Sequence, residues 1–237
     1  MTEMQKIIKY CALALAIFLI FIIVTTIANV GYNILEKTDL INNSNSKLLK
    51  NNIVISNNES EIREIDIDIK SSNIILKTAK NFKVETNNKD IKYSYEDGKV
   101  LIKQNNVNKW YFNKNNNSKL IFYIPSEISL EKINLNNNVG DVKIDFEKIS
   151  NLNIDLDVGD IFVKSMLSGK NIIKSNIGDI NLKLSLKQED YKFEFDKDIG
   201  EVKLNNNNNI KRDIITGNSN NNLKIKTNIG DIKINTF

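Results

Sequence analysis

The chain has 237 residues, which is enough for one domain of ordinary size plus a short anchor and too few for a large multidomain enzyme. It carries 33 Lys and Arg against 29 Asp and Glu, a net charge of +4, with one Cys, one Pro and no His. Because His is the commonest general base and the commonest metal ligand, its absence argues against most hydrolase, oxidoreductase and zinc chemistries.

An uncharged, apolar segment covers residues 10–30. As a helix, its 21 residues would reach about 31 Å, which is enough to cross the hydrocarbon core of a bilayer. Lys6 and Lys9 precede the segment, whereas no excess of positive charge follows it. The positive-inside rule therefore predicts a single-pass protein of the cell membrane, with residues 1–9 in the cytoplasm and the C-terminal domain extracytoplasmic.

Two alternatives to a retained anchor concern the same segment. A cleaved signal peptide is one, because Thr26-Ile27-Ala28 loosely fits a small-residue cleavage motif, although the apolar run is longer than in a usual signal. Lipidation is the other, but Lys9-Tyr10 lacks the small residues that precede a lipidated Cys, so Cys11 is expected to be an ordinary buried apolar residue. Residues 31–58 are predicted to be a juxtamembrane linker, with a short strand at 53–55.

The remaining chain, residues 59–237, contains a repeat. Five motifs place a Gly before an acidic residue, and their glycines are 19, 19, 22 and 30 residues apart. Counted from each Gly, positions −7, −5, −1, +2 and +4 are apolar with the exception of Asn171. Period-two spacing on both sides of the Gly is typical of β-strands. The motifs are Val139-Gly140-Asp141-Val142, Val158-Gly159-Asp160-Ile161, Ile177-Gly178-Asp179-Ile180, Ile199-Gly200-Glu201-Val202 and Ile229-Gly230-Asp231-Ile232.

Each motif is interpreted as a strand, a tight corner at the Gly and a second strand, with the apolar positions directed to one interior. Gly suits such a corner because it adopts positive φ, and the acidic side chain that follows can bond nearby backbone N–H groups. One unit cannot bury its apolar face alone, whereas stacked units share a continuous core. The repeat therefore predicts an all-β fold, a β-solenoid, which follows the transmembrane helix expected at residues 10–30.

The part before the repeat is also predicted to be β, but it is less regular. Ser71-Ser72-Asn73-Ile74 is interpreted as a degenerate corner of the same kind. Strands are expected at 65–69, 82–84, 91–95, 100–103 and 119–124, the last ending at Pro125.

This arrangement resembles the "putative adhesin" family of bacterial envelope proteins, a β-strand-repeat domain of unknown function. The resemblance rests on the strand at 65–69, the segment 95–102, Tyr123-Ile124-Pro125 and the repeated Gly-Asp corners. The resemblance implies a right-handed β-solenoid fold, membrane tethering, no established catalytic residues and, in some members, a link to envelope-stress signalling. The chain departs from the family pattern at Glu201, where Asp is usual.

The five acidic corner residues Asp141, Asp160, Asp179, Glu201 and Asp231 would form one column if the units stack in register. Carboxylates about 4.8 Å apart repel, so their charge has to be offset. Bound Ca²⁺ is one hypothesis, since it prefers oxygen ligands. The alternative, which we favour, is that the carboxylates accept backbone N–H bonds while Lys143, Lys164, Lys183, Lys203 and Lys233 supply counter-charge. No cofactor is predicted.

Three adjacent aromatic residues, Trp110, Tyr111 and Phe112, lie in a polar stretch. They cannot all face one side of a strand, so they are expected either to cap one end of the solenoid or to contact a partner.

Together these features predict a non-enzymatic adhesion or protein-interaction module of the bacterial cell envelope. Its expected partners are the bilayer, through residues 10–30, and an envelope protein or glycan; a nucleic acid is not expected, because basic clusters and phosphate loops are missing. Envelope-stress sensing is the alternative, and a polysaccharide-active enzyme using Asp155 and Asp157 is the less favoured one. The strand at 232–237 is expected to be an open edge through which copies could pair as homo-oligomers.

Overall fold

The computed structural model describes residues 53–55, 62–104, 118–205, 210, 214–217 and 220–237. The predicted anchor at 10–30 and the triplet Trp110 to Phe112 lie outside these residues, so their placement stays a prediction. Within the part of the chain that is described, no helix is long and apolar enough to cross a membrane. All described residues belong to one compact unit, Leu49–Phe237.

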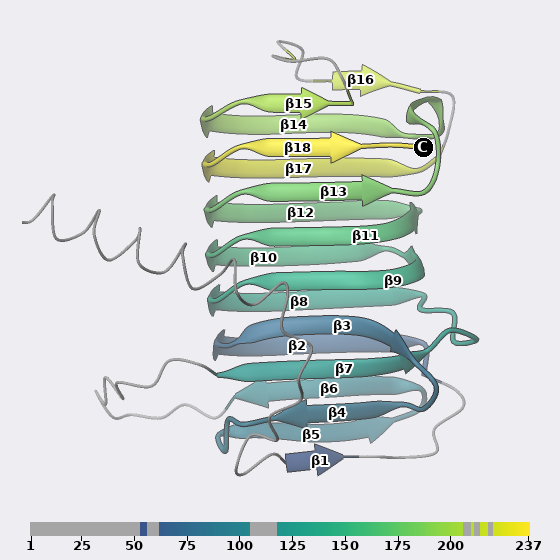
Figure 1. The fold of residues 1–237 in the computed structure, drawn as a ribbon, viewed down its shortest axis with the longest axis vertical. Helices are drawn as coiled ribbons and strands as arrows, with labels where there is room; N and C mark the ends of the chain where they lie inside the picture. The colour runs from purple at the N-terminus through teal and green to yellow at the C-terminus, as the bar shows by residue number, and fades with distance from the viewer. Residues whose placement is uncertain (1–52, 56–61, 105–117, 206–209, 211–213, 218–219) are drawn as a thin grey trace, which may run out of the picture. The chain divides into compact units, whose positions relative to one another are not determined.

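The described chain is all-β, as predicted, with two sheets of nine strands each and a single short 3-10 turn at Gln188–Asp190 (Figure 1). We call them sheet A, in the order β1-β4-β7-β3-β9-β11-β13-β18-β15, and sheet B, in the order β16-β14-β17-β12-β10-β8-β2-β6-β5. The strands are β1 (Ile53–Ile55), β2 (Glu64–Ser71), β3 (Asn73–Ala79), β4 (Lys83–Thr86), β5 (Ile91–Glu96), β6 (Lys99–Gln104), β7 (Lys119–Pro125), β8 (Lys132–Val139), β9 (Val142–Ser150), β10 (Leu152–Val158), β11 (Ile161–Ser168), β12 (Lys170–Ile177), β13 (Ile180–Leu184), β14 (Lys192–Ile199), β15 (Val202–Leu204), β16 (Ile214–Thr216), β17 (Asn222–Ile229) and β18 (Ile232–Asn235).

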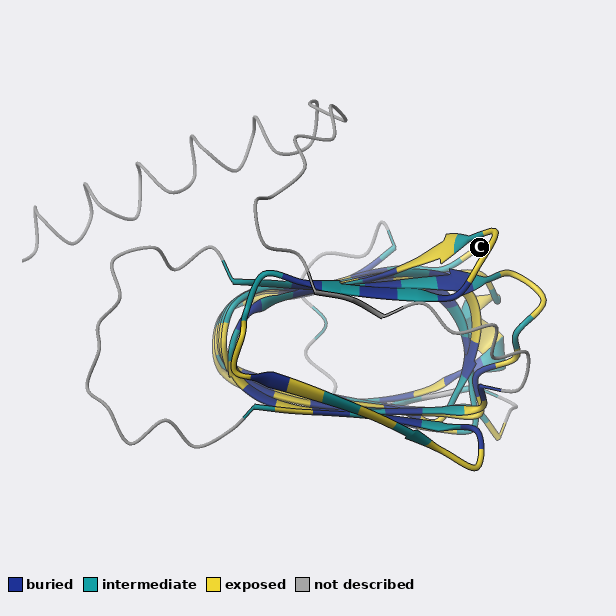
Figure 2. Cartoon of the chain, turned by 90° about the horizontal axis from the view of Figure 1, so that it is seen from below, coloured by how far each residue is buried: buried dark blue, intermediate teal, exposed yellow. Residues whose placement is uncertain are grey.

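Each Gly-Asp unit supplies one strand to sheet B and the next strand to sheet A, and β2/β3 and β6/β7 are divided between the sheets in the same way. We call each such pair of strands a rung. Neighbouring rungs pair in parallel and in register, so that Leu156 lies opposite Asn137 on one side and Ser175 on the other. Buried and more exposed residues alternate along the strands of the two facing sheets (Figure 2), and the buried hydrophobic side chains form one core cluster. Stacking thus joins the apolar faces of single rungs into one core, as the repeat predicted.

The spatial order of the rungs differs from their order in the sequence. The β2/β3 rung lies between β6/β7 and β8/β9, and the C-terminal rung β17/β18 lies between β12/β13 and β14/β15 (Figure 1). The prediction of an open edge at the C-terminal strand is therefore wrong, because β18 pairs with β13 on one side and β15 on the other. The last two corner glycines are 30 residues apart because the chain between them forms β16 before it returns to the position between β12/β13 and β14/β15.

The residue before each corner Gly faces outward, which corrects the prediction that it lines the interior. These residues remain between 42% and 65% exposed: Val139, Val158, Ile177, Ile199 and Ile229. Strand alternation ends at the corner, where each Gly has a φ between +126° and +147°. At four of the five corners the last interior position is three residues before the Gly instead, where Asn137, Leu156, Ser175 and Thr227 are buried, whereas Lys197 before Gly200 is exposed.

Both ends of the stack are closed by antiparallel strands. At one end β4 pairs antiparallel with β7 and β5 with β6, and at the other end β16 pairs antiparallel with β14. Of the four edge strands, β1, β15 and β16 have three residues each and β5 has six. Short edges offer few unpaired backbone groups, which reduces the tendency toward edge-to-edge association.

Candidate functional site

The Gly-Asp corners lie in one column along one edge of the stack, at the left of Figure 1. In spatial order the column contains Gly140, Gly159, Gly178, Gly230 and Gly200. The backbone N–H group of each of the first four glycines donates to the carbonyl of the residue before the next Gly, for example Gly178 to Ile229 at 2.9 Å. The predicted degenerate corner extends this column, because the Ser72 N–H donates to the Val139 carbonyl at 3.1 Å.

Close approach of the backbones explains why the corner residue is Gly. A Cβ built on Gly178 would overlap the carbonyl oxygen of Gly159, and φ at this Gly is +143°. A side chain at this position would therefore be strained in its backbone and would also push the rungs apart.

The acidic side chains of the corner bond to the backbone of the next rung. Asp141 Oδ1 accepts the N–H of Asp160, and Asp160 Oδ1 accepts that of Asp179, both at 3.1 Å. In the same way Asp179 Oδ1 accepts the N–H of Asp231, and Asp231 Oδ1 accepts that of Glu201, both at 2.9 Å. Asn73 Oδ1 begins this series by accepting the Asp141 N–H at 3.0 Å. These bonds support the interpretation that we favoured for the column, in which the carboxylates accept backbone N–H groups.

The counter-charge differs from the expected pattern. Lys203 pairs with Glu201 at 3.0 Å, but Lys164 pairs with Asp145 at 3.2 Å instead of a corner carboxylate. Lys143 and Lys183 lie over the ring of Phe162, with ammonium-to-centroid distances of 5.8 and 5.7 Å. Within the described residues, no group of three His, Cys, Asp or Glu side chains is placed to hold a metal ion.

A second polar column, inside the corner, was missed in the sequence. Asn137 Nδ2 donates to the Ser72 carbonyl at 2.9 Å, and the Ser175 hydroxyl donates to the Gly159 carbonyl at 3.3 Å. The Thr227 hydroxyl likewise donates to the carbonyl of Gly178 at 3.4 Å. The signal was a small polar residue three positions before the Gly, where alternation calls for an apolar one.

Asn171, the one polar residue among the apolar repeat positions, serves the opposite corner. Its side chain is fully buried, its Oδ1 accepts the Leu152 N–H at 3.0 Å, and its Nδ2 donates to the carbonyls of Ser168, Gly169 and Asn222 at 3.2 to 3.3 Å. A buried amide that meets its hydrogen-bonding needs in this way ties three rungs together.

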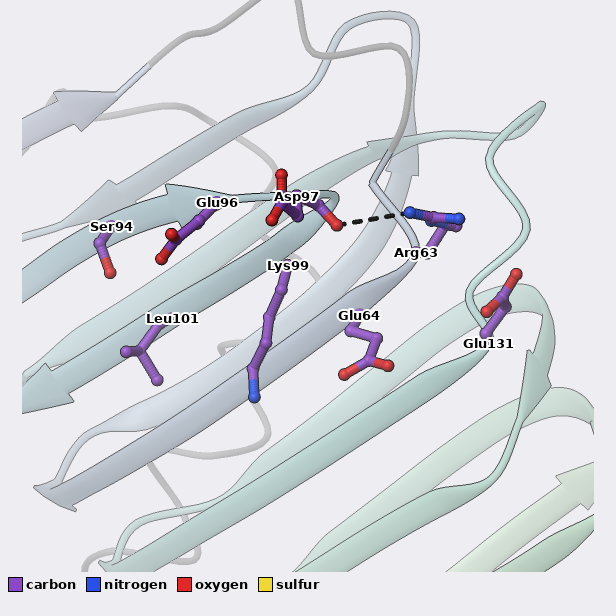
Figure 3. A pocket seen from close by; sticks show the side chains of 8 residues that line it. All are labelled: Arg63, Glu64, Ser94, Glu96, Asp97, Lys99, Leu101 and Glu131. Atoms are coloured by element: carbon purple, nitrogen blue, oxygen red, sulfur yellow. Dashed lines mark hydrogen bonds between the residues drawn. The ribbon is translucent and has the colours of Figure 1, made fainter.

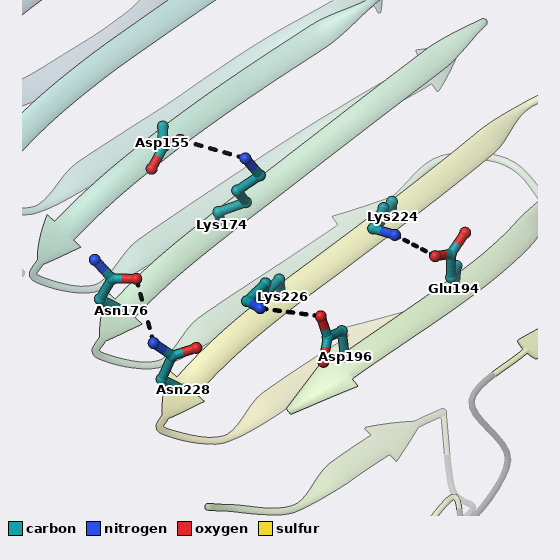
Figure 4. Close-up of polar contacts among 8 residues, drawn as sticks. All are labelled: Asp155, Lys174, Asn176, Glu194, Asp196, Lys224, Lys226 and Asn228. Atoms are coloured by element: carbon teal, nitrogen blue, oxygen red, sulfur yellow. Dashed lines mark hydrogen bonds and ion pairs between the residues drawn. The ribbon is translucent and has the colours of Figure 1, made fainter. Parts of the chain in front are cut away.

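The outer face of sheet B carries ion pairs between neighbouring strands (Figure 4). Lys174 pairs with Asp155 at 3.4 Å and Lys226 with Asp196 at 3.1 Å, and Lys224 also pairs with Glu194. Asp157, the partner of Asp155 in the enzyme hypothesis, accepts a bond from Asn176 Nδ2 at 2.9 Å. Both carboxylates are thus engaged in contacts between strands.

One recess of about 640 Å³ lies at the start of β2 and β6 (Figure 3). Its lining mixes both signs of charge: Arg63, Glu64, Ser94, Glu96, Asp97, Lys99, Leu101 and Glu131. The Arg63 side chain donates to the Asp97 carbonyl at 3.4 Å, and Lys99 forms an ion pair with Asp66 at 2.9 Å. The hydrogen bond to Asp66 raises the pKa of Lys99.

On the outer face of sheet A, Tyr123 is the centre of a polar cluster. Lys77 and Lys83 lie 4.6 and 5.4 Å from its ring centroid, and its hydroxyl donates to Glu85 at 2.9 Å. Burial and the bond to Glu85 raise the pKa of Tyr123 to about 12. Burial opposes ionisation of Glu85 as well, but the bonds from Lys83 and Tyr123 outweigh it, so the pKa of Glu85 is lowered.

Comparison with known proteins identifies the fold. The sequence pattern of the Toastrack DUF4097 family matches residues 62–235. A "putative cell adhesion protein" from Clostridium sporogenes has 18% identity and a TM-score of 0.60, over 79% of this chain and 99% of its own. A "putative adhesin" from Bacteroides fragilis has 15% identity and a TM-score of 0.35, over 78% and 98%. A comparison with curated proteins finds no match. The family match over residues 62–235 confirms the resemblance that the sequence suggested.

Proposed function

Because the chain belongs to the Toastrack DUF4097 family, we propose that it is a membrane-anchored, extracytoplasmic β-solenoid that acts as a non-enzymatic adhesion or interaction module of the bacterial cell envelope. The fold it shares with a "putative cell adhesion protein" is consistent with this role. The anchoring and the orientation rest on residues 10–30 and the lysines that precede them.

One observation carries the proposal. The repeated acidic residues, which are the most conspicuous chemistry of the sequence, bond to the backbone of the next rung and do not converge on a cleft. The repeat thus builds an extended surface of outward side chains on two flat sheets. Such a surface suits binding along its length, as in other solenoid proteins.

The test compares cells that express the full chain with cells that lack it. Retention of cells on surfaces coated with envelope fractions should fall on deletion and return when the full chain is restored. Protease added to intact cells should remove a C-terminal tag and spare an N-terminal one. Unchanged retention would contradict an adhesion role, and a change in envelope-stress gene expression without a change in retention would favour the sensing alternative.

A further inference from the structure

The outer face of sheet A carries a group of cations around one carboxylate, Asp145, which lies opposite both Lys77 and Lys164. Six neighbouring strands, β3, β9, β11, β13, β18 and β15, each direct one lysine outward. We call this group the lysine face; it consists of Lys77, Lys143, Lys164, Lys183, Lys233 and Lys203. All are exposed except Lys203, which is half-buried.

The charge of this face contrasts with that of sheet B in the same rungs. The six strands of sheet A hold seven lysines and two acidic residues, Asp145 and Glu147. Their partners in sheet B, β2, β8, β10, β12, β17 and β14, hold eight lysines and eight acidic residues. In both sheets the strands of these rungs pair in parallel and in register. The difference in charge between the two sheets therefore comes from the outward side chains, and stacking of the rungs does not require it.

Most of the lysine face is not neutralised within the protein. Lys164 and Lys203 form ion pairs, whereas Lys143 and Lys183 rest on the ring of Phe162. Among the described residues, no carboxylate forms an ion pair with Lys77, Lys143, Lys183 or Lys233. Sheet B instead pairs Lys174, Lys224 and Lys226 with acidic residues of the next strand (Figure 4).

The arrangement also places like charges directly opposite each other. Lys164 lies opposite Lys183, and Lys203 lies opposite Lys233. Such pairs destabilise a sheet, since adjacent strands are about 4.8 Å apart. The folded protein alone gains nothing from this repulsion, whereas an anion bound across the strands would relieve it.

The acidic column at the corner does not cancel this field over the whole face. Lys164 and Lys183 are four residues beyond Asp160 and Asp179, about 13 Å along the strand. This exceeds the Debye length of about 8 Å at physiological ionic strength, whereas Lys143, Lys203 and Lys233 are two residues, about 7 Å, beyond Asp141, Glu201 and Asp231. Those carboxylates also accept backbone N–H groups, which holds them at the edge of the sheet.

Spacing and composition favour a soluble polymer over a bilayer. From β9 to β15 the face extends over about four strand spacings, roughly 19 Å, and offers a cation about every 5–10 Å along the stack. The exposed residues before the corner glycines lie along the edge. Tyr123 lies beneath Lys77, and Phe162 is half-buried between two lysines. A surface that enters a membrane normally adds apolar side chains to its cations.

From these observations we propose that the lysine face binds a linear polyanion, whose phosphate or carboxylate groups lie across β9, β11, β13, β18 and β15. The inference deepens the proposed function, because it assigns a surface and a ligand class to the interaction module. Its ligand-binding test in solution is independent of the retention assay in cells. If neither polymer binds, this inference fails and the adhesion proposal remains. If deletion of the chain leaves the retention of cells unchanged, the adhesion proposal fails and the inference about polymer binding remains.

The experiment uses the full chain in nanodiscs of zwitterionic lipid. Fluorescent inorganic polyphosphate and fluorescent polyglutamate are titrated at several salt concentrations. The test variant combines Lys143→Gln, Lys183→Gln and Lys233→Gln. The matched control combines Lys132→Gln, Lys170→Gln and Lys192→Gln, which removes the same charge from exposed positions of sheet B.

We expect the wild type to bind and the test variant to lose at least tenfold in affinity at low salt. Each neutralised phosphate contributes about 0.7 to the slope of log K against log salt for a flexible chain, so the test variant should lower that slope by about 2. The control should stay within twofold of the wild type. Binding of polyphosphate alone identifies phosphate as the ligand group, and equal binding of both polymers identifies charge as the only requirement.

Several results would overturn the proposal: no binding of either polymer by the wild type, equal losses in both variants, or binding to anionic vesicles through the lysine face without binding to the polymers. Melting curves show whether each variant is folded. A variant with Arg at Lys143, Lys183 and Lys233 keeps the charge and should keep the affinity. If it loses as much as the Gln variant, a charge-based site is refuted.

Discussion

Replacement of the central corner Gly by Ala, Gly178→Ala, tests the explanation of the corner column. The new Cβ would overlap the Gly159 carbonyl oxygen, and the residue would keep a φ near +143°. Strain of this kind costs a non-Gly residue about 1–3 kcal/mol. Moving the rungs apart also weakens two bonds, from the Gly178 N–H to Ile229 at 2.9 Å and from the Asp179 N–H to Asp160 at 3.1 Å, each contributing about 1 kcal/mol.

The free energy of unfolding should therefore fall by about 3–5 kcal/mol in Gly178→Ala. We would measure it by urea unfolding of the full chain, followed by circular dichroism of the strands. Gly169→Asn is the control at the opposite corner, where φ is +69° and the preceding rung already has Asn151 with φ of +62°. Because Asn tolerates this left-handed conformation, we expect a loss of only about 1 kcal/mol. Equal losses in the two variants would refute the close-approach explanation.

Three other predictions concern the corner, the acid stability and the strand order. Asp179→Asn keeps the Oδ1 acceptor and should change the free energy of unfolding by no more than about 0.5 kcal/mol, whereas Asp179→Ala should lower it by about 1–2 kcal/mol. A rise of several degrees in the Tm of the wild type with millimolar Ca²⁺ would instead support the calcium hypothesis. The lowered pKa of Glu85 contributes stability that is complete above its ordinary pKa of 4.5 and is lost as the pH falls through its folded value. Urea unfolding between pH 6 and pH 3 should thus show a steeper acid loss in the wild type than in Glu85→Gln, and parallel curves would contradict this. In hydrogen exchange, amides of β18 should exchange more slowly than those of β15, since β18 is paired on both sides; the reverse order would contradict the interleaved stack.

The repeat positions were readable in the sequence because they follow from local geometry. Period two fixes which residues of a strand share a face, and a Gly followed by an acid marks a corner that few other residues can form. The strands around the five corner glycines, the all-β class and the degenerate corner at Ser72 were therefore all predicted correctly. The role of the acidic column as an acceptor of backbone N–H groups followed from the same reasoning.

Reasoning from strand alternation failed at the corner. Simple alternation placed Val158 and its equivalents inside, but the alternation ends just before the corner Gly, so these residues face outward and the position of Ser175 or Thr227 is the last interior one. The buried amide of Asn171 looked like an exception to the repeat. Its partners, the Leu152 N–H and the Asn222 carbonyl, come from other rungs, so its role depended on which rungs are neighbours.

The sequence by itself determined the rung: two strands, their inward and outward faces, and the Gly-Asp corner that joins them. Only the tertiary structure decided the order of the rungs, because every rung presents the same register and backbone hydrogen bonds to its neighbours, and local pattern cannot distinguish them. That order buries β17 and β18 within the stack and places Lys233 opposite Lys203. The lysine face therefore exists as a surface only once the rungs are stacked.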